Sequence, residues 1–129
     1  MKYASIDIGL KRIGVAFCFD SQIVLPQSAI LRKNRNQASR ELRELLLRWE
    51  IETLVVGLPK DGSSADEMQR RIMHFVSLLE LQIPIEYQDE QGSSFEAKEM
   101  TKGDFRHKRD GKIDSIAAKI ILERYLKIL

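Results

Sequence analysis

The stretch SIDIGLKRIGVAF, residues 5–17, decides the fold of this chain of 129 residues. Two short apolar runs are separated by Gly9 and a Lys-Arg pair, so the spacing predicts two strands joined by a tight turn. The first run encloses a carboxylate, Asp7, between two isoleucines. A buried carboxylate is costly unless it is paired, hydrogen-bonded or bound to a metal. Asp7 therefore either faces water at a sheet edge or belongs to a site.

The rest of the chain predicts further strands followed by strand-helix units. Pro26 marks an edge or an irregularity in the third strand, and the β-branched run TLVVG predicts a central parallel strand that is buried on both faces. Ser64 and Glu67 match a capping-box pattern at the start of a helix. The predicted order is strands at 2–9, 12–19 and 23–31, a helix at 36–50, a strand at 53–57, a helix at 64–79, a strand at 85–90, a short helix at 93–100, a mobile loop at 101–112 and a final helix from 114.

The composition is that of an ordinary globular protein, with 43% hydrophobic and 31% charged residues and a net charge of +2. The length predicts one domain. The single cysteine, Cys18, excludes an internal disulfide framework and suits a reducing cytosol. No signal-peptide pattern is present and the apolar runs are too short to cross a membrane, so we expect a cytoplasmic protein without membrane contacts.

Three acidic residues fall where a mixed sheet could gather a site: Asp7, Glu90 after the 85–89 run, and Asp114 at the start of the last helix. Each also has an ordinary explanation, as a water-facing edge acid, a solvated strand end and a helix N-cap, respectively. Together, however, like charges about 4 Å apart repel by about 4 kcal/mol at an effective dielectric constant near 20. A cluster of three therefore requires cations, and oxygen ligands favour Mg²⁺ or Mn²⁺. Two such ions would suit phosphoryl transfer.

The stretch DIGLKRIGVA, residues 7–16, resembles the opening signature of the YqgF family, also called the RuvX or Holliday junction resolvase family. VVGLP at 55–59, YQDE at 87–90 and the segment 112–126 resemble later parts of the family pattern in matching order. The resemblance covers nearly the whole chain. It implies a single nuclease domain over residues 1–129, with an α/β fold that is RNase H-like: a mixed five-stranded sheet, ordered β-β-β-α-β-α-β-α, with helices on both faces.

The family's acidic triad would be Asp7, Glu90 and Asp114, acting as catalytic residues and metal ligands. By analogy Asp7 would bridge two ions, and the other two acids would each hold one. Arg12, with Lys11 beside it, matches a basic position that would contact phosphate. The chain departs from the family pattern after Glu90, where QGSS replaces an Arg-Leu-Thr-Thr run, although Ser93 and Ser94 keep hydroxyls for substrate binding.

A basic run, FRHKRDGK, lies just before Asp114. Charge runs are usually solvated surface, but basic residues beside a metal site could hold the nucleic-acid backbone. We interpret this run as substrate-binding and leave a second basic stretch, at residues 32–35, unassigned. The residues of the first run that we assign to substrate binding are Arg106, Lys108, Arg109 and Lys112.

The function that we predict is a metal-dependent endonuclease that processes the 5′ end of precursor 16S ribosomal RNA, with pre-ribosomal particles as partners. One alternative is resolution of branched DNA, the Holliday junction. Another is a non-catalytic RNA-binding assembly factor. An actin-like ATPase or sugar kinase, which needs two lobes, ranks third because the chain is too short.

Overall fold

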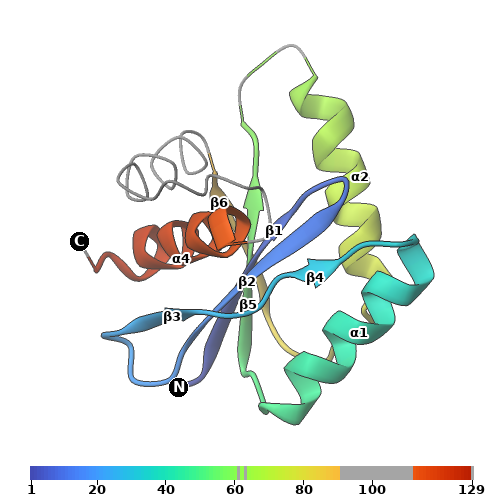
Figure 1. The fold of residues 1–129 in the computed structure, drawn as a ribbon. Coiled ribbons are helices and arrows are strands. Elements are labelled where there is room, and N and C mark those ends of the chain that lie inside the picture. The colour runs from blue at the N-terminus through green and yellow to red at the C-terminus, as the bar shows by residue number, and fades with distance from the viewer. Residues whose placement is uncertain (61, 63, 91–111, 129) are drawn as a thin grey trace.

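The computed structural model describes residues 1–60, 62, 64–90 and 112–128, apart from the side chain of Lys112 (Figure 1). The helix predicted at 93–100 and nearly all of the loop predicted at 101–112 lie outside these residues. The described elements are β1 (Tyr3–Ile8), β2 (Arg12–Cys18), β3 (Val24–Pro26), β4 (Ile30–Leu31), α1 (Arg35–Arg48), β5 (Thr53–Leu58), α2 (Ala65–Ser77), β6 (Ile85–Asp89) and α4 (Lys112–Leu126).

The predicted hairpin is present, because β1 and β2 pair antiparallel from Tyr3–Cys18 to Ile8–Ile13. The turn closes where the Gly9 N–H donates to the Arg12 carbonyl oxygen at 2.9 Å. The third strand, predicted as one segment, is instead two short strands that both pair with β2. Pro26 is the last residue of β3, and proline lacks the N–H that an uninterrupted ladder requires.

The sheet runs in the order β3-β2-β1-β5-β6, with β4 paired to β2 beside this path. The β5 strand is parallel to both of its neighbours, β1 and β6, as its unbroken apolar pattern predicts. Helices α1 and α2 cover one face and α4 covers the other (Figure 1). The predicted mixed sheet with helices on both faces is confirmed.

Alternation along the strands divides the core between the two faces. Ile6, Val15 and Leu54 belong to the larger cluster, with residues of α1 and α2. Ala16 and Val55 belong to a second cluster with residues of α4. Beyond Arg12 at its start, the α4 face of β2 carries only the small residues Gly14, Ala16 and Cys18, so this helix can approach the strand closely.

The helix starts differ from the sequence prediction in one respect. The capping box lies at α1, where Asn34 accepts from the Gln37 N–H at 2.8 Å and the Gln37 side chain accepts from the Asn34 N–H at 3.3 Å. At α2 the predicted box is wrong, because Ser64 makes no side-chain cap hydrogen bond. Its backbone, with φ −117° and ψ 18°, is not extended as a capping residue usually is. Glu67 instead pairs with Arg71 at 2.7 Å.

Among the described helices, none combines the length and apolar character that a membrane span requires.

Candidate active site

Asp7 lies in the sheet between two glycines. On one side it pairs with Gly14 of β2. On the other side Ile6 pairs with Val56 of β5, so Asp7 is level with Gly57. Neighbours in one row of a sheet point to the same face. That face is the one covered by α4, because a β-carbon at Gly14 would meet Asp114 and one at Gly57 would meet Ile121.

Gly57 makes room for Glu90. A β-carbon at Gly57 would lie 3.1 Å from Glu90 Oε2 and 3.2 Å from Glu90 Cβ. The Glu90 N–H donates to the Leu58 carbonyl oxygen at 3.1 Å, which extends the β5–β6 pairing by one residue beyond Asp89. From this position the Glu90 side chain crosses β5 and shares a hydrogen bond with the side chain of Asp7. The pairing thus identifies Glu90, rather than Asp89, as the partner of Asp7.

The surroundings of Glu90 favour its protonated form. Burial raises the pKa of Glu90, the negative charge of Asp89 raises it further, and the hydrogen bond with Asp7 opposes the rise. A hydrogen bond between two carboxyl groups requires that one of them carries a proton. The raised pKa of Glu90 and its hydrogen bond with Asp7 therefore both favour a proton on the pair in the absence of a cation.

Asp114, in the first turn of α4, is buried beside this pair with 6% of its surface exposed. A β-carbon at Gly14 would lie 2.0 Å from the Asp114 carbonyl oxygen, so the backbone of α4 rests directly on β2. The next residue reinforces the contact, because the Val15 N–H donates to the Ser115 hydroxyl at 3.3 Å. One turn further on, the Ser5 hydroxyl donates to the Ala118 carbonyl oxygen at 2.6 Å.

The structure thus joins Asp7 and Glu90 and holds the backbone of Asp114 against the strand beside them. Among the described residues it does not assemble three or more acidic, histidine or cysteine side chains into one metal-binding group. Lys11 is exposed in the β1–β2 turn and Arg12 is half-buried at the start of β2. The predicted substrate-binding residues that lie outside the described residues are Ser93, Ser94, Arg106, Lys108 and Arg109, and the side chain of Lys112 is likewise not described.

Sequence reasoning missed the roles of Gly14 and Gly57. A glycine inside a strand often marks a place where another chain segment or a ligand approaches closely. Each glycine lies inside an apolar run, Gly14 in IGVAF and Gly57 in TLVVGL, so this signal was present in the sequence. Only the register shows that both lie level with Asp7.

We expect Glu90→Gln to stabilise the metal-free protein at neutral pH. With its pKa raised above the ordinary value of 4.5, Glu90 ionises at a greater free-energy cost in the folded protein than in the unfolded chain. That cost is absent below pH 4.5, where Glu90 is protonated in both states, and develops as the pH rises through the folded-state pKa. Thermal melts across pH should therefore show a higher Tm for the variant at pH 7 and a gain that disappears at low pH. Glu86→Gln, an exposed glutamate on β6, is the matched control, and an equal gain in both variants would contradict the prediction.

Residues 1–128 match the model of a protein family described as RuvX, Holliday junction resolvase. A protein from a Sulfurovum strain, provisionally named a pre-16S rRNA nuclease, is 73% identical over 99% of this chain and all of its own length. A protein from Sulfurimonas denitrificans with the same name is 51% identical over 98% of each chain.

A solved structure shows the same fold. Thermus thermophilus RuvC, in complex with a Holliday junction substrate, superposes with a TM-score of 0.64 at 13% identity, over 98% of this chain and 94% of its own. This likeness confirms the RNase H-like arrangement that the sequence resemblance implied. The family match over nearly every residue, with relatives more than half identical along the same length, shows that the chain belongs to the RuvX family of Holliday junction resolvases.

Proposed function

We propose that the chain is a metal-dependent nuclease that hydrolyses phosphodiester bonds in nucleic acid. The observation that carries the proposal is the half-buried carboxyl pair of Asp7 and Glu90, in which Asp7 lies level with a glycine on each neighbouring strand. An acid whose pKa is raised, here Glu90 beside Asp7, is costly to the fold, so such an arrangement is typical of functional sites. Membership in the RuvX family supports the reading as a nuclease.

The donor set fits a divalent cation such as Mg²⁺ or Mn²⁺. The pair offers carboxylate oxygens only, which hard cations prefer. Asp7 and Glu90 would hold the cation, and we propose Asp114 as the third ligand because its residue lies beside the same row. The binding of two ions, with Asp7 between them, remains a prediction. A divalent cation at this position would polarise the phosphate and supply a nucleophilic water.

The carboxyl pair must lose its common proton before both acids can ligate a cation. Metal affinity should therefore rise with pH in the range where Glu90 titrates. Gly9 and the short turn after it leave the carboxyl end of β1 open to a substrate backbone. Lys11 and Arg12 lie at this end of the strand and would contact phosphate.

The names of the close relatives favour precursor 16S ribosomal RNA as the substrate. The solved neighbour was seen with a Holliday junction, but at 13% identity it supports the fold rather than the substrate. We therefore propose RNA processing, in contact with pre-ribosomal particles, as the main function and junction resolution as the second candidate.

Cleavage assays with and without metal test the proposal. A fragment of the ribosomal RNA precursor and a four-way DNA junction are incubated in parallel with Mg²⁺, with Mn²⁺ and with EDTA. We expect cleavage of the RNA with either metal and none with EDTA. Cleavage of the junction but not of the RNA would favour Holliday junction resolution as the function. Binding without cleavage under every metal condition would contradict a nuclease and favour the assembly factor.

A further inference from the structure

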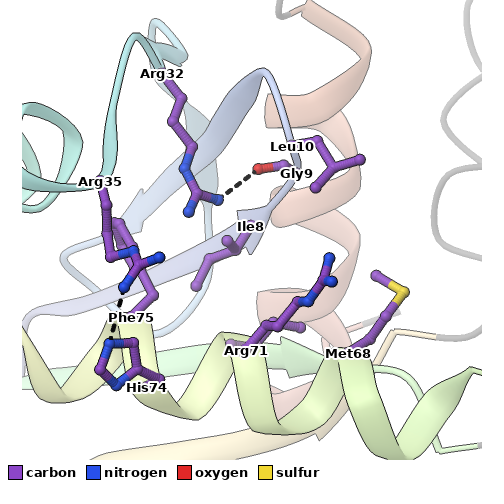
Figure 2. A pocket seen from close by; sticks show the side chains of 10 residues that line it. Ile8, Gly9, Leu10, Arg32, Arg35, Met68, Arg71, His74 and Phe75 are labelled. Atoms are coloured by element: carbon purple, nitrogen blue, oxygen red, sulfur yellow. Dashed lines mark hydrogen bonds between the residues drawn. The ribbon is translucent and has the colours of Figure 1, made fainter.

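A pocket lies on the face of the sheet opposite the carboxyl pair. It has a volume of about 390 Å³ and lies between the end of β1, the start of α1 and residues 68–75 of α2 (Figure 2). The volume lies in the range of small-ligand sites. Ile72 and Phe75 form its buried floor. Its polar lining is basic and comes from segments far apart in sequence: Arg32, Arg35, Arg71 and His74.

Arg32 is held in place by the surrounding structure. Its Nη1 donates to the Gly9 carbonyl oxygen at 3.0 Å, and its guanidinium lies over the Phe75 ring, 5.1 Å from the centroid. Burial lowers the pKa of Arg32, and the positive charge of Arg35 lowers it further. An arginine that is half-buried next to a second cation is costly unless an anion is nearby. The positions of these two arginines therefore favour an anionic ligand.

Arg35 is placed unfavourably for the stability of its own helix. It is the first residue of α1, where the macrodipole is positive, and the first turn contains no acidic residue. Its Nη1 lies 3.2 Å from Nε2 of His74 (Figure 2). Arginine can only donate, so Nε2 of His74 is the acceptor in this contact. The helix end and the two arginines thus direct positive potential into one pocket.

The carboxylates of the described residues do not neutralise this charge. Glu67 forms an ion pair with Arg71, but both side chains are more than half exposed, so the pair is weak. Within the described ranges, neither Arg32 nor Arg35 forms an ion pair with a carboxylate. A fixed guanidinium fork without a carboxylate partner is well suited to phosphate.

We propose that this pocket binds a backbone phosphate of a nucleic-acid strand, as an anchor separate from the carboxyl pair. The identity of the ligand rests on the proposed function, because a nuclease must hold a polyanion. Asp7 is followed directly by Ile8 and Gly9, which line the pocket. One strand crossing the end of β1 can therefore reach both sites. The exposed side chains of Leu10 and Met68 at the rim offer apolar contacts to a sugar or base.

Binding measured in EDTA tests the anchor without any cleavage. The probe is a short labelled single-stranded RNA with a 5′ hydroxyl, so that it carries only phosphodiesters. The variants are Arg35→Gln and Arg71→Gln, singly and together, because both side chains are exposed and their loss should leave the fold intact. The matched control is Arg40→Gln, an exposed arginine of α1 outside the pocket.

We expect Arg35→Gln to weaken RNA binding roughly tenfold, the effect of one charge-assisted hydrogen bond. The slope of log affinity against log salt should also fall by about 0.7 for each lost phosphate contact with a single strand. Affinities equal to that of the control variant would overturn the proposal. An effect seen only with a 5′-phosphorylated RNA or a nucleoside monophosphate would also overturn it, since the pocket would then bind a terminal monoester.

The outcome is independent of catalysis. If the wild-type protein cuts RNA with Mg²⁺ and the pocket variants bind like the control, only the anchor fails. If the wild-type protein never cuts but the pocket variants lose affinity, the nuclease proposal fails and the anchor remains.

Discussion

Asp7→Asn is expected to reduce metal-dependent cleavage by at least roughly a thousandfold. Asp7 contacts Glu90 and lies at the centre of the glycine-flanked row. Asparagine keeps the shape but removes a charge that would hold the cation, and a bound cation stabilises the transition state by several kcal/mol. Each 1.36 kcal/mol corresponds to about tenfold in rate. Single-turnover cleavage of the preferred substrate with saturating Mg²⁺ measures the loss.

The same variant should bind RNA in EDTA at least as tightly as the wild-type protein does, because a carboxylate that faces phosphates without metal repels them and adds no affinity. Asp66→Asn is the matched control, since it removes the same charge from an exposed position in the first turn of α2. We expect that control to cut normally. Cleavage by Asp7→Asn at the wild-type rate would exclude Asp7 from the site. Equal losses of binding and cleavage would instead indicate a damaged fold.

The hairpin that carries Asp7 could be predicted because its signal is local. Alternation along residues 12–18 and the glycine turn determine which strands pair, and the β-branched run at 53–57 indicates a parallel strand buried on both faces. The resemblance of residues 7–16 to a family signature pointed to Asp7 as a candidate catalytic residue and metal ligand. These features depend on neighbours in sequence, so they could be predicted without coordinates.

The partner of Asp7, the basic pocket and the pairing of the third strand depend on contacts between segments that are distant in sequence. The family resemblance named Glu90, but strand alternation alone does not separate it from Asp89. That distinction rests on the β5–β6 register and the room above Gly57. The basic pocket could not be predicted either, because Arg32 and Arg35 meet Arg71 and His74 only after α2 packs beside them. The sequence shows that Pro26 interrupts the third strand. It does not show that the segment divides into two short strands that both pair with β2.

Gly14→Ala is expected to destabilise the protein by about 3 kcal/mol, at the upper end of the usual cost of overpacking. The added β-carbon would lie 2.0 Å from the Asp114 carbonyl oxygen and 2.8 Å from the Ser115 backbone nitrogen. Both atoms belong to the backbone of α4, so the helix must move away from β2 as a unit. The move would also break the hydrogen bond from Val15 to Ser115. The intrinsic preference of a strand for alanine over glycine, about 0.5–1 kcal/mol, offsets only part of this cost.

Comparing Gly57→Ala with Gly14→Ala distinguishes the cost of a clash with a side chain from the cost of a clash with the backbone. There the β-carbon would first meet Ile121 Cδ1 at 2.6 Å, the tip of a flexible side chain, and then Glu90 Oε2 at 3.1 Å. We therefore expect a smaller loss of stability, about 1 kcal/mol, together with weaker cleavage because Glu90 is displaced from Asp7. Denaturant unfolding of both variants, paired with cleavage rates normalised to folded protein, measures the two effects. The two glycines lie on either side of the same carboxylate, so the two variants can be compared directly. Equal losses of stability would show that the α4 backbone moves as easily as the Ile121 side chain. That result would contradict the close packing of Asp114 on Gly14.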